Sequence, residues 1–386
     1  MTISRREFVK TLGWSGATTL TSGRIVSARG HESLGELWAG AAVNSSVIQL
    51  DSNENPNGPG PRVLDAIRGA FPVVPRYPYD EAAALTSTLT RLHAVPSGSV
   101  VLGCGSGEIL RMTLQAFTSA TRHLVTPAPT YETPARYAAT FGVPLQAVDV
   151  NGTLALDLPA MLARARGAGV VYMCNPNNPT GGILPASVVS AFVERLAIES
   201  PQTVVLVDEA YYEYVDDPAY KTSIPLTLRY KNVIVSRTFS KVFGMAGLRC
   251  GYGVGHPDSV AKMTPFRLAT SVNQLALAAA TNALGDREFV ERERTLNREA
   301  RAYTRRVFEQ LGYIVAPSEA NFLFVDLRQD ARFFREGCQR SGVLVGRAFP
   351  PLSTYARISM GTMDEMQRAS AVFTRVLRGA APAPRG

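Results

Sequence analysis

Lysine is scarce in this chain. Among its 386 residues are 40 lysines and arginines, and only five of these are lysine: Lys10, Lys221, Lys231, Lys241 and Lys262. An amine nucleophile must lose a proton near neutral pH, which lysine can do and arginine cannot. Four of the five lie in the terminal arm or in polar, turn-like segments, whereas Lys241 follows an apolar run and a hydroxyl-rich turn. If this protein forms a Schiff base, we expect Lys241 to form it.

Cysteine and histidine are also rare, with four of each. The cysteines form no Cys-x-x-Cys pair, so neither a zinc site nor a disulfide framework is indicated. The histidines show no metal-ligand spacing. No apolar stretch is long enough to span a bilayer. We therefore expect no metal site and no membrane span.

The composition is that of an ordinary globular enzyme, with 46% hydrophobic and 19% charged residues. A length of 386 residues suits two domains and an extension. The net charge of +8 comes from arginines spread along the whole chain, without a zinc-finger, RNP or basic-helix pattern. We interpret this charge as a solvated surface and expect no nucleic-acid partner.

The first thirty residues are set apart. The segment Ser4-Arg5-Arg6-Glu7-Phe8-Val9-Lys10 resembles a twin-arginine export signal, and a weakly apolar stretch follows from Thr11 to Gly23. Ser27-Ala28-Arg29 offers a small-residue cleavage region. The alternative is a cytosolic amphipathic arm, because Arg24 cuts the apolar stretch short. We favour export to the periplasm or beyond over a cytoplasmic location, and exclude residues 1–30 from the fold.

Short apolar runs alternate with helical periodicity over the rest of the chain. Each run ends in a polar cluster; the runs are 100–102, 170–173, 203–207 and 233–235. This alternation predicts an α/β fold with a mostly parallel sheet covered by helices, whose ligands sit at the carboxyl ends of the strands. An alanine-rich helix at 276–284 and later runs at 313–315, 321–325 and 357–359 predict a smaller α+β domain. The expected domains are an arm at 31–75 that contributes to the small domain, a large domain at 76–275 and a small domain at 276–386.

Three polar clusters follow these runs. Gly103-Cys104-Gly105-Ser106-Gly107-Glu108 is a strand-to-helix glycine loop, whose free amides suit an anion, although it is neither a Walker loop nor a complete dinucleotide pattern. The segment 175–182, Asn-Pro-Asn-Asn-Pro-Thr-Gly-Gly, would be a plain loop if it stood alone. Asp208 ends the most apolar run, where a carboxylate needs a positive partner such as a protonated ring nitrogen. The alternative is that Asp208 caps the next segment.

These clusters and the Lys241 segment, taken in order, resemble the fold-type I pyridoxal-phosphate aminotransferases of class I/II. The closest likeness is to the histidinol-phosphate aminotransferase branch, and it runs from about Leu50 to Gly361. The resemblance implies pyridoxal 5'-phosphate as cofactor and a large domain with a seven-stranded, mostly parallel sheet. It also implies a homodimer with active sites at the interface.

The resemblance assigns a role to each candidate residue. Lys241 would form the Schiff base and later shuttle the α-proton, and Asp208 would keep the pyridine nitrogen protonated. Asn178 and Tyr211 would hydrogen-bond the ring hydroxyl, and Tyr131 would stack on the ring. The remaining cofactor ligands would surround the phosphate: the amides of Ser106, Gly107 and Glu108, the side chains of Thr238, Ser240 and Arg249, and Tyr77 from the neighbouring subunit.

The substrate side of the resemblance is less regular. Arg357 resembles the arginine that grips the substrate carboxylate with a bidentate fork. Asn321 would either touch substrate or cap a turn. In the histidinol-phosphate enzymes an arginine directly after the Val-x-Val strand helps hold the substrate phosphate; here Gly346 stands there and Arg347 follows. Arg347 remains a candidate substrate ligand, although in a strand a shift by one residue would point it to the opposite side. A second departure is Asn57, where many relatives carry tyrosine.

The expected function is amino-group exchange between an L-amino acid and a 2-oxo acid, with 2-oxoglutarate and glutamate as one pair. The same scaffold also supports a decarboxylase of the phosphothreonine type or a β-lyase. A non-catalytic pyridoxal-phosphate binding protein is a further alternative. Retention of the lysine, the aspartate, the tyrosine and both arginines argues against it.

Overall fold

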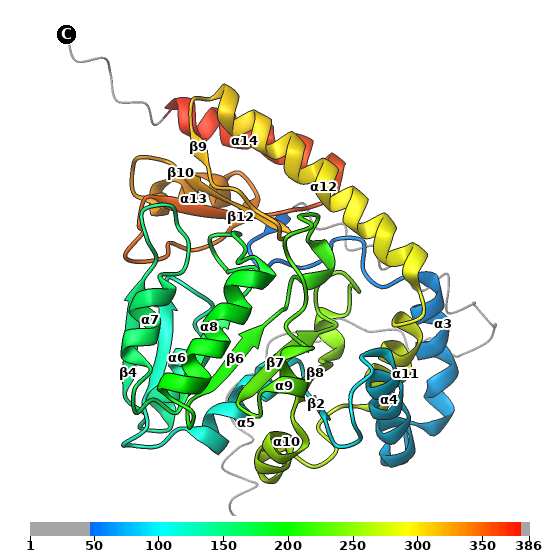
Figure 1. The fold of residues 1–386 in the computed structure, drawn as a ribbon. Helices are drawn as coiled ribbons and strands as arrows, with labels where there is room; N and C mark the ends of the chain where they lie inside the picture. Colours follow the sequence, from blue (N-terminus) through cyan, green and yellow to red (C-terminus); the bar gives the residue numbers. More distant parts are fainter. Residues whose placement is uncertain (1–46, 380–386) are drawn as a thin grey trace, which may run out of the picture. The chain divides into compact units, whose positions relative to one another are not determined.

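The computed structural model describes residues 47–379, and its largest element is a seven-stranded sheet (Figure 1). The strands run in the order β2-β8-β7-β6-β5-β3-β4, and only β8 is antiparallel to its neighbours. The predicted α/β class and mostly parallel sheet are confirmed. In sheet order the strands are Val100–Gly103, Gly251–Gly255, Val233–Thr238, Val204–Asp208, Val170–Cys174, Leu124–Ala128 and Leu145–Asp149.

The central strands β5, β6 and β7 are buried along their whole length. Both faces of these strands are therefore covered, which explains why they read as continuous valine-rich runs rather than as an alternating pattern. Their register places Cys174, Asp208 and Ser236 side by side. The segments that carry the predicted chemistry consequently emerge next to one another at one edge of the sheet.

Twelve α-helices and four short 3-10 helices connect the strands of the described chain. Helix α5 contacts β2, β5, β6, β7 and β8 and buries Ile109, Leu110 and Thr113. The α-helices are α3 Pro61–Ala70, α4 Tyr79–Leu92, α5 Ser106–Phe117, α6 Thr133–Thr140, α7 Leu158–Arg164, α8 Ala186–Glu199, α9 Leu226–Arg229, α10 Pro257–Met263, α11 Gln274–Ala283, α12 Arg287–Gln310, α13 Ala331–Arg340 and α14 Met363–Gly379. The 3-10 helices are Phe71–Val73, Tyr212–Tyr214, Ala246–Leu248 and Thr264–Phe266.

A second hydrophobic core lies under two smaller sheets. One is antiparallel with the order β12-β10-β9, and the other is a parallel pair of β1 and β11. Helices α12, α13 and α14 pack over this core, which confirms the smaller α+β region. The strands are β1 Ile48–Leu50, β9 Ile314–Val315, β10 Phe322–Asp326, β11 Val343–Val345 and β12 Tyr355–Ser359.

Two elements near the expected domain boundaries, β1 and α11, pack over different hydrophobic cores. Strand β1 pairs with β11 over the smaller core. Helix α11 packs against α3, and its buried alanines belong to the larger core. The residue numbers expected for the domains stay a prediction. The export signal expected at residues 4–10 lies outside the residues that the structure describes.

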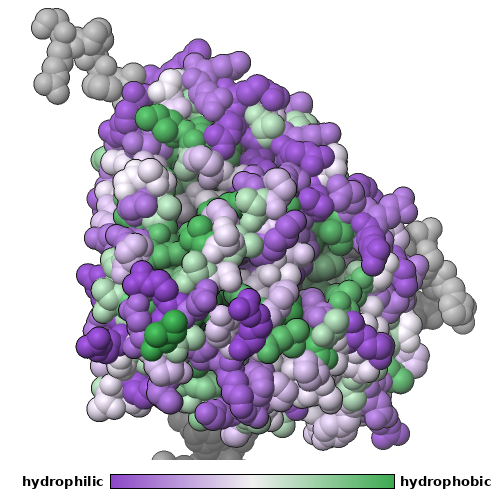
Figure 2. Space-filling view, in the orientation of Figure 1, coloured by the Kyte–Doolittle hydropathy of each residue, from purple (hydrophilic) through white to green (hydrophobic). Residues whose placement is uncertain are grey.

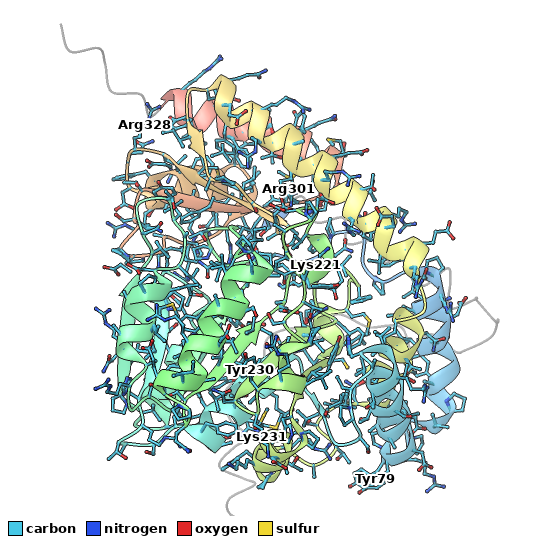
Figure 3. All side chains as sticks on the ribbon, viewed as in Figure 1. Tyr79, Lys221, Tyr230, Lys231, Arg301 and Arg328 are labelled. Atoms are coloured by element: carbon cyan, nitrogen blue, oxygen red, sulfur yellow. The ribbon has the colours of Figure 1, made fainter. Side chains whose placement is uncertain are left out.

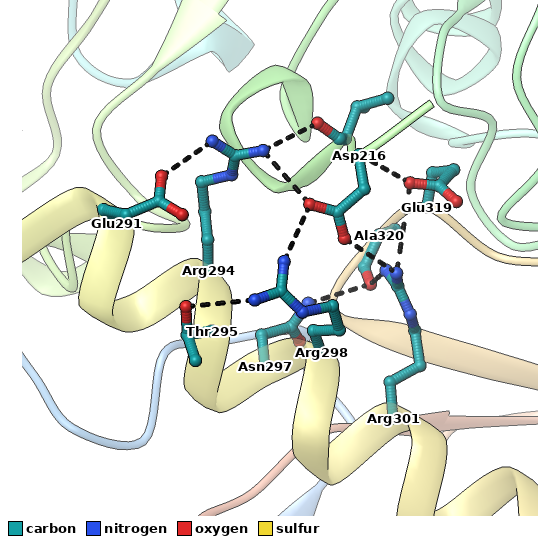
Figure 4. Close-up of polar contacts among 10 residues, drawn as sticks. Asp216, Glu291, Arg294, Thr295, Asn297, Arg298, Arg301, Glu319 and Ala320 are labelled. Carbon is teal, nitrogen blue, oxygen red and sulfur yellow. Dashed lines mark hydrogen bonds and ion pairs between the residues drawn. The ribbon is translucent and has the colours of Figure 1, made fainter. Parts of the chain in front are cut away.

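Helix α12 is tied to the larger core by a cluster of charges (Figure 4). Asp216 accepts hydrogen bonds from Arg294 at 3.1 Å and Arg298 at 3.2 Å, and Arg301 lies 3.7 Å away. The Asp216 amide donates to Glu319, just before β10, at 2.8 Å. Much of the positive charge of α12 is therefore used in ion pairs. The outer side of the helix is mostly hydrophilic (Figure 2). No helix within residues 47–379 is both long and apolar enough to cross a membrane.

Candidate active site

A cavity of about 500 Å³ opens at the carboxyl ends of the central strands. One wall comes from the ends of β5, β6 and β7 and the loops that follow them, including Asn178, Asp208 and Lys241. The opposite wall comes from the segments that follow β1 and β11 and from Arg357 of β12. Segments attached to the large sheet and to the two smaller sheets therefore meet around one space, as expected for a ligand site.

Asp208 lies at the end of β6 and is 2% exposed. Its two carboxylate oxygens accept hydrogen bonds from Ser236 at 2.7 Å and from Tyr172 at 3.0 Å. Burial raises the pKa of Asp208 to about 6, against the opposing effect of these hydrogen bonds. The carboxylate is held by two neighbouring strands, and it does not cap the next segment. This placement favours an electrostatic role toward a cationic group in the cavity.

Lys241 follows β7 and reaches into the same cavity. Its Nζ donates to the backbone carbonyls of Asn53 at 2.8 Å and Ser52 at 3.4 Å. Burial, and then the positive charge of Arg357, lower the pKa of Lys241 to about 8. The three other lysines of the described chain are exposed; Lys231, for example, pairs with Asp258 at the surface (Figure 3). Lys241 is therefore the amine suited to nucleophilic chemistry.

Tyr211 joins the two walls of the cavity. Its hydroxyl accepts hydrogen bonds from the side-chain amides of Asn178 at 3.2 Å and Asn53 at 3.0 Å. Asn53 has a positive φ of 53° and is held in place by Ser359 of β12. Asn178 accepts a hydrogen bond from Arg357 at 2.8 Å. The structure thus brings Asn178 and Tyr211 together, as predicted, and adds Asn53 as their partner.

The part of the cavity at the start of α5 is suited to an anion. Ser106 and Gly107 line it at the first turn of α5, where backbone amides and the helix dipole favour negative charge. Thr238, Ser240 and Arg249 line the same cavity. A Cβ atom on Gly105 would overlap the Arg249 guanidinium. Glycine at this position therefore lets the guanidinium lie close to the start of α5. Tyr131 also lines the cavity, and burial raises its pKa.

Three predicted residues lie elsewhere. The amide of Glu108 donates to Gly105, and its carboxylate accepts from Cys104, Leu268 and Ser271, so Glu108 braces the loop and does not offer a free amide to an anion. Asn321 donates to the carbonyls of Asn53 and Glu54 behind the cavity wall, which supports a turn instead of a substrate contact. Tyr77 is 74% exposed and lies outside this chain's own cavity.

The two arginines predicted to bind substrate both line the cavity. Arg357 donates to Asn178 and to the carbonyl of Asp51, and its buried Nε has no hydrogen-bond partner in the described chain. Arg347 follows β11, which ends at Val345, so the expectation that strand geometry turns Arg347 away from the site is wrong. A side chain at Gly346 would overlap the carbonyl of Arg357. The arginine therefore reaches the cavity from position 347 instead.

Sequence reasoning missed several cavity residues. Asn53 lies in a segment that reads as a turn, and its role depends on partners at 211 and 359, which no local pattern reveals. Glu132 and Phe349 also line the cavity. Glu132 directly follows the predicted Tyr131, and Phe349 lies two residues after the predicted Arg347, so the only available signal was closeness in the sequence to a predicted residue.

Comparison with known proteins identifies the family. The family model for aminotransferase class I and II matches residues 45–373. The chain belongs to this family. A histidinol-phosphate aminotransferase from Symbiobacterium thermophilum is 38% identical over 336 residues, which cover 86% of this chain and 90% of the relative. The protein is accordingly a pyridoxal-phosphate-dependent aminotransferase of the histidinol-phosphate aminotransferase-like kind, and the prediction of an enzyme is confirmed.

Solved structures support the same assignment. The histidinol-phosphate aminotransferase from Sinorhizobium meliloti in complex with pyridoxal-5'-phosphate has a TM-score of 0.81 and 29% identity, and covers 86% of this chain and 92% of that chain. The L-threonine-O-3-phosphate decarboxylase from Porphyromonas gingivalis has a TM-score of 0.74 and 19% identity, covering 86% of this chain and 100% of that chain. The second likeness shows the fold alone.

The aminotransferase cavity fits pyridoxal phosphate. Lys241 offers an amine with a lowered pKa, Asp208 offers a buried carboxylate for the ring nitrogen, and the start of α5 with Arg249 suits the phosphate. Asn178 and Tyr211 present an amide and a hydroxyl for the ring oxygen. When bound, the cofactor supplies an electron sink for the bond that breaks at the substrate α-carbon.

We expect cofactor uptake by the cofactor-free aminotransferase to follow the titration of Lys241. A pKa of about 8 leaves mainly the protonated amine at pH 7 and a growing neutral fraction as pH rises. The initial rate of borohydride-fixed pyridoxal-phosphate labelling should rise about fivefold from pH 7 to pH 8 and level off above pH 9. Arg357→Met should move the midpoint upward, because it removes the second cause of the shift. Lys241→Arg is the control and should fix no cofactor; a flat profile between pH 7 and 9 would contradict the assignment.

Proposed function

We propose that this aminotransferase moves the α-amino group of an L-amino acid to 2-oxoglutarate and forms glutamate. The observation that carries the proposal is the shared cavity of Lys241 and Arg357. An amine that gains and loses a proton near pH 8 faces the same space as a buried guanidinium. A fork of this kind recognises the α-carboxylate common to every amino acid and 2-oxo acid.

Each residue acts on a stated atom. Arg357 binds the substrate carboxylate and so fixes the α-carbon relative to Lys241. Lys241 takes the proton from the substrate α-carbon and holds it on its amine for return, as its lowered pKa allows near neutral pH. Asp208 balances the positive charge of the ring nitrogen from a dry position. Asn178 and Tyr211 hold the ring oxygen and keep the reacting plane aligned.

Transamination is favoured over decarboxylation by the position of Arg357. Decarboxylation must release the carboxylate that a guanidinium in this place retains, and a β-lyase needs a leaving group on the substrate side chain. Arg347 is an exposed cation at the cavity wall, so the amino donor includes acidic or phosphorylated side chains among its candidates.

A donor screen tests the proposed reaction. Holoenzyme supplied with 2-oxoglutarate and single L-amino acids, including histidinol phosphate, should form glutamate with at least one donor. Lys241→Ala should lower the rate at least about 1,000-fold, because proton transfer loses its base. Lys262→Ala, at an exposed position, is the matched control. Release of carbon dioxide or pyruvate without glutamate would favour the decarboxylase or the β-lyase instead.

We also propose that the enzyme works as a homodimer. Support comes from apolar and aromatic side chains that gather on the surface around α3, α4 and residues 266–268. They include Phe71, Val74, Tyr77, Tyr79 and Leu268. Figure 3 shows Tyr79 at the end of α4, where the helix begins. An exposed set of this size favours burial against another chain, and Tyr77 would then reach the phosphate in the partner subunit's cavity.

Subunit mixing tests the role of Tyr77. We expect Tyr77→Ala to weaken cofactor binding and Lys241→Ala to be inactive. When the two variants are unfolded, mixed and refolded together, half of the dimers should combine one subunit of each kind. One site in each such dimer would carry both Lys241 and Tyr77, which restores about a quarter of the wild-type activity. Activity that never exceeds the mean of the separate variants would show that Tyr77 serves no neighbouring site.

A third proposal concerns location. We propose that residues 1 to about 30 direct export by the twin-arginine route, supported by the Ser4-Arg5-Arg6-Glu7-Phe8-Val9-Lys10 pattern. That route suits an enzyme loaded with a cofactor, because it carries folded proteins. The family match begins at residue 45, so the pattern lies outside the matched catalytic region.

Fractionation tests the export proposal. In a bacterial host with the twin-arginine pathway, the wild-type chain should appear in the periplasmic fraction. Arg5→Lys combined with Arg6→Lys should keep it in the cytoplasm. Arg24→Lys, outside the pair, serves as the matched charge-preserving control. Identical distribution of wild type and double variant would overturn the proposal.

A further inference from the structure

Glu132 places a carboxylate in the wall of the cavity. The reaction proposed above gives this carboxylate no role. Glu132 stands directly before helix α6 and lines the cavity with Arg136 and Arg347. Its Oε1 lies 2.5 Å from Nη2 of Arg347, and its Oε2 lies 3.8 Å from Nη2 of Arg136. The side chains of Glu132 and Arg347 are 45% and 42% exposed, so water and small solutes reach this pair.

Arg347 is held in position by contacts other than Glu132. Its Nη1 donates to the carbonyl of Ala348, and its guanidinium carbon lies 4.3 Å from the centroid of the Phe349 ring. Phe349 is 4% exposed and packs edge-on against Phe324. The guanidinium therefore rests on a fixed aromatic surface, and opening the Glu132 pair does not release it.

Arg357 shares that aromatic surface. Its guanidinium carbon lies 5.2 Å from the centroid of the same Phe349 ring. The two guanidinium groups are therefore close to each other, and burial, followed by the positive charge of Arg347, lowers the pKa of Arg357. Two guanidinium groups over one ring suit a short dicarboxylate, with one carboxylate on each and the methylene chain between them.

We propose that Glu132 is a built-in competitor for the distal carboxylate of the substrate. This inference rests on the proposed use of 2-oxoglutarate and glutamate. When a dicarboxylate occupies the cavity, its second carboxylate replaces Glu132 on Arg347, and Glu132 turns to Arg136. When a substrate without that carboxylate occupies the same site, Glu132 returns and neutralises Arg347.

The change of partner at Arg347 has a physical reason in the two-stage exchange of the amino group. Both substrates visit the same cavity in turn, and their side chains can differ in charge. A guanidinium without a partner carboxylate would favour acidic substrates over every substrate that lacks an acidic side chain. A pair near the solvent opens at small cost, because exposed ion pairs contribute little stability. Glu132 therefore widens the range of donors while weakening the binding of dicarboxylates.

Binding of unreactive acids to the holoenzyme tests the competition without turnover. Glutarate carries two carboxylates and pentanoate carries one at the same chain length. Glu132→Gln should lower the Kd for glutarate roughly three- to tenfold relative to the Kd for pentanoate, measured by calorimetry. Arg347→Met should raise the Kd for glutarate at least about tenfold, and Arg347→Lys should restore part of that loss. Glu199→Gln removes a carboxylate from an exposed pair with Arg195 and is the matched control.

The double variant decides the mechanism. If Glu132 acts through Arg347, Glu132→Gln should bring no gain in the Arg347→Met background. An equal gain in both backgrounds, or an unchanged ratio of the two Kd values in Glu132→Gln, would overturn the proposal. If Glu132→Gln lowers the Kd for glutarate as expected but the wild-type enzyme forms no glutamate, 2-oxoglutarate is rejected as the acceptor and the competition at Arg347 is kept. If the wild-type enzyme forms glutamate but Glu132→Gln leaves the Kd for glutarate unchanged relative to pentanoate, the acceptor is kept and the competition by Glu132 is rejected.

Discussion

The carboxyl group of Asp208 is almost completely buried, and the surrounding strands supply the hydrogen-bond donors that a buried charge requires. Parallel pairing of β5, β6 and β7 sets Tyr172 and Ser236 on either side of it, and each donates one hydrogen bond. The same register delivers Lys241 to the cavity a few residues after β7 ends. A shift by one residue in any of the three strands would separate the charge from its donors and from the amine.

Two cores cooperate around this charge. The larger core carries Asp208, Tyr211 and Lys241, whereas the smaller one carries the strands next to Asn53 and Arg357. Hydrogen bonds across the cavity, from Asn53 to Tyr211 and from Arg357 to Asn178, join the two walls. The same contacts therefore fix the positions of Arg357 and Tyr211 relative to each other through Asn178.

Much of the fold was predictable because its central strands are buried on both faces and read as valine runs. Strand β8 was not predicted: its sequence Gly-Tyr-Gly-Val-Gly has little β-propensity, and glycine is required at Gly253 because a Cβ would crowd Ile109. Edge strand β4 is mostly exposed and gave no apolar run. The role of Asn53 depends on contacts more than 150 residues away, which no local pattern contains.

The resting partner of Lys241 is a backbone carbonyl, that of Asn53. A carboxylate partner would hold the ammonium form and would be left as an unpaired anion each time the amine moved. A neutral carbonyl exerts a weaker hold, and its separation from the amine leaves no net charge behind. The amine can therefore leave this carbonyl without breaking an ion pair. The loop that begins after β1 thereby holds the Lys241 amine through an uncharged hydrogen-bond acceptor.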